Sequence, residues 1–243
     1  MSALAAASGF AGDLRRALKR GMPKGELVRQ TYEIGNRSML LVVGGMMFFG
    51  AVLMAHGSVQ ARRIVGDFSV VGPPYFELLL RELGPTFAGI LAAVRLGAAL
   101  SAELASMQVT EQVDALKMSA GDPISDLVLP RLIGGLIAVP CLIIGGTMAA
   151  ALVSAAVANV GYGADGGAFL DAALVTRGDL TAFAVKTLLY GIAIPTASVL
   201  AGMRAHGGAA AVGEATTKGV VWASVSVLII DWAVSGVLSV VGM

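Results

Sequence analysis

The sequence predicts an all-α integral membrane protein with about five transmembrane helices, preceded by an N-terminal amphipathic helix at the membrane interface. Its composition is the first observation: 56% of the 243 residues are hydrophobic and only 14% are charged, against roughly 25% charged residues in a soluble domain. The second is that charge-free stretches long enough to cross a bilayer recur along the chain. The formal net charge of +1 gives no indication of nucleic-acid binding, so no nucleic-acid partner is expected.

Residues 1–37 predict a basic segment on the cytoplasmic side. Seven of the lysines and arginines fall between residues 10 and 37, and apolar residues recur there at every fourth position. This pattern is typical of a helix that lies in the interface of an anionic leaflet. A solvated basic tail is the alternative, because Gly21, Pro23 and Gly25 interrupt the helix early. Either interpretation places the N-terminus in the cytoplasm by the positive-inside rule.

Residues 38–243 are predicted to form the transmembrane domain. The first span covers residues 38–61, which contain no formally charged side chain. At about 1.5 Å per residue this stretch gives roughly 36 Å of helix, enough to cross the hydrocarbon core. Residues 62–82 then mix charged residues with prolines, so we predict a non-cytoplasmic connection with a short helix from Tyr75.

Four further spans are predicted at residues 83–104, 132–159, 180–203 and 219–242. Five crossings that begin in the cytoplasm place the polar segments 105–130 and 204–218 on the cytoplasmic side and the C-terminus outside. The second span carries a face of small residues that permits close helix packing: Gly97, Ala98, Ser101 and Ala102.

Three charges within the predicted spans are candidate functional residues: Arg95, Glu103 and Asp231. A charge at the bilayer centre costs about 3 kcal/mol on insertion scales, so Arg95 is expected to have a partner. We expect Arg95 either to line a substrate cavity or to form a structural ion pair with Glu103 or Asp231. Snorkelling of its side chain towards water is the alternative.

Several classes of chemistry are disfavoured by the sequence. It contains no GxxxxGK[ST] phosphate loop, so the chain is not expected to bind and hydrolyse ATP itself. Cys141 stands alone in an apolar run and is predicted to be a core residue, and with only two distant histidines no metal site is expected. No cofactor is expected in the chain, and an enzyme is a poor interpretation, although an intramembrane enzyme that uses Asp231 or Glu103 stays open.

A polar segment from Glu103 to Arg131 interrupts the apolar sequence. It holds five carboxylates: Glu103, Glu111, Asp114, Asp122 and Asp126. Within it we predict a short helix that Thr110 caps and Asp122-Pro123 ends, with the next span restarting at Pro130-Arg131. A solvated connecting loop is the alternative, since cytoplasmic loops are polar by default. Because the chain lacks a nucleotide site, we expect the short helix to receive force from a partner.

Two separated blocks of sequence resemble the permease family of MlaE and YrbE. The first block consists of Glu82-Leu83-Gly84-Pro85, Arg95-Leu96-Gly97-Ala98-Ala99, Ala102-Glu103-Leu104, residues 107–116, Asp122-Pro123 and Pro130-Arg131. The second consists of Gly207-Gly208-Ala209, Val212-Gly213, Ala215-Thr216-Thr217 and Val220-Val221. The resemblance covers about residues 30–242.

The resemblance implies the membrane subunit of an ABC-type lipid transporter in the bacterial inner membrane. It implies three protein partners: a cytoplasmic ATPase that holds ATP and Mg, an MCE-domain protein that carries lipid, and a second permease copy, either identical or different. The transported molecule would be phospholipid or a related lipid. By this resemblance residues 107–118 are the coupling helix seated in a groove of the ATPase, with these residues at the contact: Thr110, Glu111, Gln112, Asp114 and Leu116.

Two departures from the family pattern concern the docking geometry. Ala105 stands where the family usually has glycine, and Ala120-Gly121 shifts a glycine by one place. Two other functions also fit the residues. A secondary transporter would use Arg95 and Asp231 as an ion relay and depend on an ion gradient. A membrane scaffold would only anchor an MCE protein and would not need ATP hydrolysis in a partner.

Overall fold

The structure is a computed structural model that describes residues 12, 14–23, 25–64, 72–163, 167, 170 and 174–241. Every regular element within these residues is helical, so the predicted all-α class is confirmed. The elements after residue 25 are α2 (Glu26–Ile64), α3 (Gly72–Leu78), a π-helical turn (Leu79–Leu83), α4 (Gly84–Val109), α5 (Gln112–Met118), a second π-helical turn (Ile124–Val128), α6 (Leu129–Tyr162), α7 (Arg177–Met203) and α8 (Ala209–Val241).

Five segments of the described chain are long and apolar enough to cross a membrane, which confirms the predicted number of spans. They are Glu26–Gln60, Gly72–Val109, Ile124–Tyr162, Arg177–Met203 and Ala209–Val240. The second segment joins α3, the first π-helical turn and α4, and the third joins the other π-helical turn to α6. Both joins continue without a break in the helical backbone.

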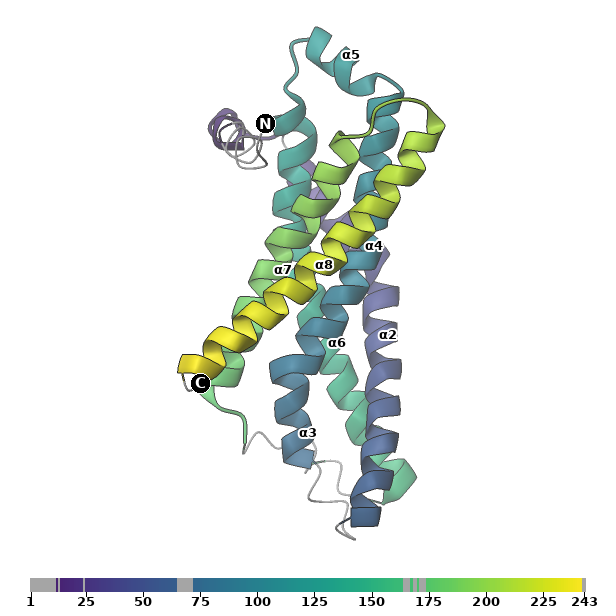
Figure 1. The fold of residues 1–243 in the computed structure, drawn as a ribbon, viewed down its shortest axis with the longest axis vertical. Helices are drawn as coiled ribbons and strands as arrows, with labels where there is room; N and C mark the ends of the chain where they lie inside the picture. Colours follow the sequence, from purple (N-terminus) through teal and green to yellow (C-terminus); the bar gives the residue numbers. More distant parts are fainter. Residues whose placement is uncertain are drawn as a thin grey trace.

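The long helices run along the length of one bundle, and α8 crosses the others obliquely (Figure 1). At one end of the bundle lie α5, the helical stretch 14–20 and the turn between α7 and α8. We call this end the α5 end. Towards the opposite end lie α3 and the last turns of α8. The helical stretch 14–20 and the last turns of α8 therefore lie towards opposite ends of the bundle.

The helices of the bundle fall into two packed groups. The first is α2 with α6, which pack along most of their length, and the second is α4 with α7 and α8. Where α4 crosses α8, Gly97 and Gly219 let the two backbones touch, since a Cβ on Gly97 would lie 2.8 Å from the Cα of Val220. Gly97 and Ser101 of the predicted small-residue face thus lie directly against α8.

The helix of the first span begins earlier than the predicted span, at Glu26 instead of residue 38. Gly21 and Gly25 have φ of +85° and +84°, so they separate the stretch 14–20 from α2. Glu26 then stabilises the new N-terminus through its charge and through an ion pair of 2.6 Å with Arg29. The predicted N-terminal helix is therefore present at residues 14–20, whereas residues 26–37 extend the first span.

The last helix also begins earlier than predicted, at Ala209 instead of residue 219. The three alanines 209–211 favour helix, and Glu214 pairs with Lys218 at 2.6 Å one turn later. The predicted polar turn 204–218 is therefore reduced to residues 204–208, where Gly207 has φ of +113°. Polarity alone misplaced this boundary, because a helix can extend beyond the apolar part of its sequence.

Cys141 is not a core residue, contrary to the prediction. Its side chain is exposed on α6, where it lines an apolar groove of about 290 Å³ between α6 and α2. An apolar run in a membrane protein does not separate residues that face protein from residues that face lipid, because both environments are apolar.

Candidate functional site

α5 is a short, separate helix at one end of the bundle (Figure 1). Its seven residues join the end of α4 to the segment that leads into α6. Val113 is buried, with 1% of its surface exposed, and anchors the helix to the bundle. The outward surface combines charge with one large apolar side chain, Met118, of which 89% is exposed. The predicted short helix in the polar segment is therefore present.

Thr110 does not cap α5, contrary to the prediction. It is the residue that follows α4, and its Oγ1 donates a hydrogen bond of 2.8 Å to the carbonyl of Ser106. Glu111 precedes α5 in a left-handed conformation, with φ of 59°, and makes no side-chain cap. The chain therefore turns sharply between the two helices, and this turn sets the direction of α5 relative to α4.

α5 ends in a Schellman turn. The amide of Gly121 donates to the carbonyl of Leu116 at 2.9 Å, and the amide of Ala120 donates to that of Lys117 at 3.1 Å. Ala120 occupies the left-handed position of this motif, with φ of 60°, where glycine is usual. The shifted glycine noted in the sequence thus places an alanine in the strained position.

The following helical segment begins at Pro123, directly after Asp122 and earlier than the predicted restart at Pro130-Arg131. The side chain of Asp122 accepts a hydrogen bond of 3.1 Å from the amide of Ile124, and Asp126 accepts one of 3.1 Å from the amide of Asp122. These reciprocal bonds satisfy amides at the helix start, as in a capping box. Two of the five carboxylates in the polar segment therefore have a structural task.

The residues predicted to contact an ATPase divide between two environments. Glu111, Gln112 and Asp114 are exposed on the outer surface of α5, and Asp114 pairs with Lys117 at 2.8 Å. Leu116 is half-buried, and its side chain lies against Gly121. The polar contacts of the prediction are therefore accessible to a partner, whereas Leu116 faces the turn that ends the helix.

Glu103 joins α4 to α6 close to α5. Its Oε1 lies 2.5 Å from Nη2 of Arg131, whose side chain is almost completely buried. Nη1 of Arg131 also donates to the carbonyl of Leu127 at 2.7 Å. The expected pair between Arg95 and Glu103 is therefore not formed, and Glu103 instead holds together the two helices that α5 connects.

A second group of charges lies towards the opposite end of the bundle and joins three helices. Nζ of Lys186 on α7 is fully buried, 2.5 Å from Oε2 of Glu82 and 2.9 Å from Oδ1 of Asp231 on α8. Arg81, beside Glu82, pairs with Asp179 at the start of α7 at 3.0 Å. We call these five residues the charge cluster.

Neutral side chains complete the hydrogen bonding of the charge cluster. Thr86 and Tyr190 donate to Oδ1 of Asp231 at 2.7 and 3.0 Å, and Ser235 donates to Glu82 at 3.0 Å. Buried charges are tolerated only when they are paired and hydrogen-bonded in this way. The cluster therefore fixes the positions of α4, α7 and α8 relative to one another.

Only Asp231 of this cluster is predicted from the sequence as an intramembrane charge. Arg81 and Glu82 fall in the predicted connection 62–82, and Asp179 falls in the loop before the fourth span. The pair of Lys186 with Asp231 could have been predicted from the sequence, because the two are opposite charges in different apolar spans and each needs a partner in the membrane.

Arg95 pairs with neither of its expected partners. Asp231 is bound to Thr86, nine residues before Arg95 on α4, so roughly 13 Å of helix separates the two sites. Within the described chain Arg95 forms no hydrogen bond or ion pair, and it lines a cleft between α2 and α4. The structure thus brings Asp231 together with Lys186, and it does not assemble an Arg95–Asp231 relay.

Large apolar side chains remain uncovered on the outer helices. On α8, Trp232 and Val240 are 80% and 87% exposed, and with Val237 they border an apolar hollow of about 420 Å³. On α2, Leu40 and Phe48 are also strongly exposed. Such surfaces suit lipid chains or another apolar protein face.

Comparisons with known proteins match nearly the whole chain to permeases. The family model described as Permease MlaE matches residues 27–237. The chain is 34% identical over 214 residues to a probable ABC transporter permease protein of Rickettsia typhi, in an alignment that covers 87% of this chain and 82% of that protein.

Two further relatives come from different kinds of cell. An intermembrane phospholipid transport system permease protein of Haemophilus influenzae is 31% identical over 219 residues, which cover 87% of this chain and 82% of that protein. The chloroplastic protein trigalactosyldiacylglycerol 1 of Arabidopsis thaliana is 35% identical over 157 residues, which cover 64% of this chain and 45% of that protein.

Proposed function

Because the chain belongs to the MlaE permease family, we propose that it is the membrane subunit of an ABC-type transporter that moves phospholipid across the bacterial cell envelope. A cytoplasmic ATPase binds ATP and Mg²⁺ and drives the cycle by pushing on α5. An MCE-domain protein exchanges lipid with the opposite end of the bundle. A second permease copy covers the apolar faces of α2 and α8 and encloses the lipid with them.

The observation that carries this proposal is the position of α5. It is a short helix with an exposed polar surface at one end of the bundle, and it connects α4 directly to the segment that enters α6. A partner that displaced α5 would therefore act on two transmembrane helices at once. Met118, a large apolar side chain that the bundle leaves uncovered, suits a groove in such a partner.

Glu111→Lys is the variant that tests the coupling role. We expect the substitution to weaken association with the ATPase by at least about tenfold, because it reverses a charge at the centre of the proposed contact. Lipid transfer between the purified complex and labelled vesicles should fall in parallel. Glu214→Lys makes the same change on an exposed helix at the same end and should leave both measurements nearly unchanged. If Glu111→Lys retained normal association and transfer, α5 would not be the coupling element.

A second measurement separates transport driven by the ATPase from the two other functions. Lipid transfer should stop when a substitution in the partner ATPase blocks ATP hydrolysis while leaving the complex assembled. Transfer that continued unchanged would favour a scaffold that only anchors the MCE protein. Transfer that required an ion gradient instead of ATP would favour a secondary transporter.

A further inference from the structure

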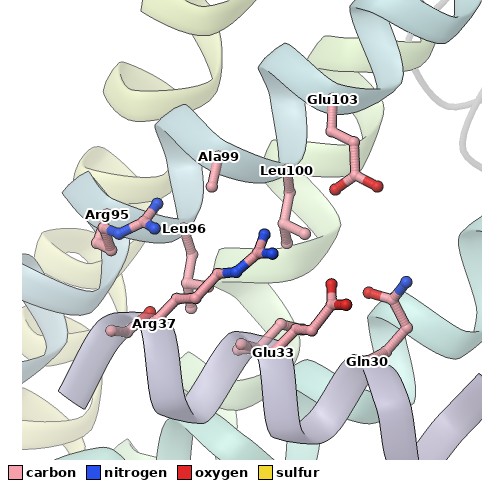
Figure 2. A pocket seen from close by; sticks show the side chains of 10 residues that line it. Gln30, Glu33, Arg37, Arg95, Leu96, Ala99, Leu100 and Glu103 are labelled. Carbon is pink, nitrogen blue, oxygen red and sulfur yellow. The ribbon is translucent and has the colours of Figure 1, made fainter.

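A small cleft opens between α2 and α4 near the α5 end, and two arginines line it from opposite walls. Arg37 extends into it from α2 and Arg95 extends into it from α4 (Figure 2). The cleft has a volume of about 40 Å³. A cleft measured in this way admits a water molecule once it exceeds about 10–15 Å³, so this one admits small polar groups but is far too small for an acyl chain.

Two glutamates, Glu33 and Glu103, also line this cleft, and each is already paired with an arginine other than Arg37 or Arg95 (Figure 2). Glu103 is bound by Arg131 at 2.5 Å, and Glu33 lies 3.4 Å from Arg29. Arg29 also binds Glu26, at 2.6 Å. The carboxylates nearest to the cleft are therefore not available to neutralise a further guanidinium fully.

Arg37 and Arg95 consequently have no counter-ion within the part of the chain that the structure describes. Neither forms a hydrogen bond or an ion pair there, although Arg95 is only partly exposed. The surrounding group contains four arginines and three glutamates, which leaves one positive charge in excess: Arg29, Arg37, Arg95, Arg131, Glu26, Glu33 and Glu103.

The position of the cleft relative to the apolar sequence matches the level of a lipid headgroup. Arg37 immediately precedes the charge-free stretch 38–61 of α2. Leu40, Leu41 and Phe48 follow it on the same face of the helix, and all three are exposed. A lipid whose headgroup reached Arg37 would thus find an apolar surface for its acyl chains directly below.

We propose that Arg37 and Arg95 form a binding site for a phosphate-bearing anion at the α5 end of the bundle, whose natural occupant is the headgroup of an anionic lipid in the adjacent leaflet. The planar guanidinium of arginine matches the oxygens of a phosphate in a bidentate geometry. Free phosphate offers the same chemistry, so an experiment must separate the two sources. The site needs only a bilayer around α2 and α4, and it does not depend on the proposed transport function.

Native mass spectrometry of the full chain tests this site. The protein is purified in detergent and titrated with phosphatidylglycerol or with phosphatidylcholine, and the affinity for each lipid is measured. The unmodified chain should bind phosphatidylglycerol more tightly. Arg37→Gln and Arg95→Gln should each weaken that binding about fivefold, and the double variant about 25-fold, since each basic residue near an anionic surface contributes roughly a factor of five. No ATPase or transport is involved, so failure here is distinct from failure of the proposed function.

A matched double variant controls for the loss of two positive charges. Arg63→Gln with Arg204→Gln removes the same charge from exposed residues outside the cleft and should leave phosphatidylglycerol binding close to normal. The site would be refuted if this control lost as much affinity as the cleft variant. It would equally be refuted if the cleft variant bound phosphatidylglycerol like the unmodified chain.

Two additional measurements identify the occupant. Displacement of phosphatidylglycerol by millimolar inorganic phosphate would confirm the anion site but assign it to a free anion, whereas resistance to phosphate would assign it to the lipid. A cleft variant with altered oligomeric state and unchanged lipid binding would overturn the proposal, because the arginines would then pair with a second copy. If the glutamine variants do not fold, Arg37→Lys with Arg95→Lys keeps the charge and should still bind more weakly than arginine.

Discussion

At the scale of single residues, Lys186 shows how the bundle holds a buried charge. It is fully buried, and it lies within ion-pair distance of two carboxylates that belong to different helices. Its removal would leave Glu82 and Asp231 close together without the cation that separates them. Loss of one member of a buried pair costs about 3–5 kcal/mol, whereas an exposed pair contributes about 0–1 kcal/mol.

Lys186→Met should therefore lower the unfolding temperature of the detergent-solubilised protein by roughly 10 °C, given a few degrees per kcal/mol for a chain of this size. Lys218→Met removes the same charge from an exposed pair with Glu214 and should change the temperature by no more than about 2 °C. Addition of Glu82→Gln and Asp231→Asn to Lys186→Met should recover much of the loss. Equal effects of the two lysine substitutions would show that the cluster does not stabilise the bundle.

The partners of single charges were the hardest feature to predict. Arg95, Glu103 and Asp231 lie in helices that are long and apolar enough to cross a membrane, but the partners of Glu103 and Asp231 are Arg131 and Lys186. Spacing along one helix predicts contacts within that helix. These pairs instead depend on which helices are neighbours and on how far each helix is shifted along the bundle axis. That information arises only when the bundle packs.

At the scale of elements, the polar segment between α4 and α6 was predicted well in outline. A short helix of exposed polar residues that ends before Asp122 is present, whereas the following helical segment starts at Pro123 and not at the predicted Pro130-Arg131. The capping details were not predicted, because Asp122 and Asp126 cap the next segment and Thr110, which follows α4, bonds back to Ser106 of that helix. Residues such as Thr and Asp favour helix ends, but sequence alone does not assign each one to a particular end.

Ala120→Gly should stabilise the turn that ends α5. Ala120 has φ of 60°, where an alanine costs roughly 1–2 kcal/mol and glycine costs almost nothing, although glycine also gains about 0.5–1 kcal/mol of entropy when unfolded. The net effect should be a gain in local stability of up to about 1 kcal/mol. It should be visible as slower hydrogen exchange at the amides of positions 120 and 121, which donate the hydrogen bonds of the turn. Ala115→Gly, within α5, should speed exchange instead. Faster exchange in Ala120→Gly would contradict the assigned turn.

At the scale of the whole molecule, the number of spans follows from composition, whereas the helix ends and the outward faces do not. Charge-free stretches locate the part of each helix that the bilayer requires. The helices α2 and α8 nevertheless continue into polar sequence at the α5 end, to Glu26 and Ala209. Cys141 shows the related difficulty: burial in protein and exposure to lipid select the same residue types.

Trp232→Cys tests whether the uncovered face of α8 meets a second copy. In a background of Cys141→Ala, which removes the only native cysteine, mild oxidation in membranes should yield a disulfide-linked dimer. Phe48→Cys on α2 should also crosslink if both outer helices face the partner, whereas Leu152→Cys, exposed on α6, should not. Absence of crosslinking at Trp232 together with efficient crosslinking at Leu152 would place the second copy on another face.

The connection that α5 makes has a mechanical consequence. The chain enters α5 from α4, which belongs to the group with α7 and α8, and leaves it towards α6, which belongs to the pair with α2. The ion pairs of Lys186 and the contact of Gly97 with α8 hold α4, α7 and α8 together, so these three helices would move as one rigid unit. The Glu103–Arg131 ion pair joins α4 to α6, and so joins the two groups of helices close to α5. The two groups would therefore rotate relative to each other about a point near this pair. A small displacement of α5 would then produce a larger separation of the two groups at the end of the bundle opposite α5.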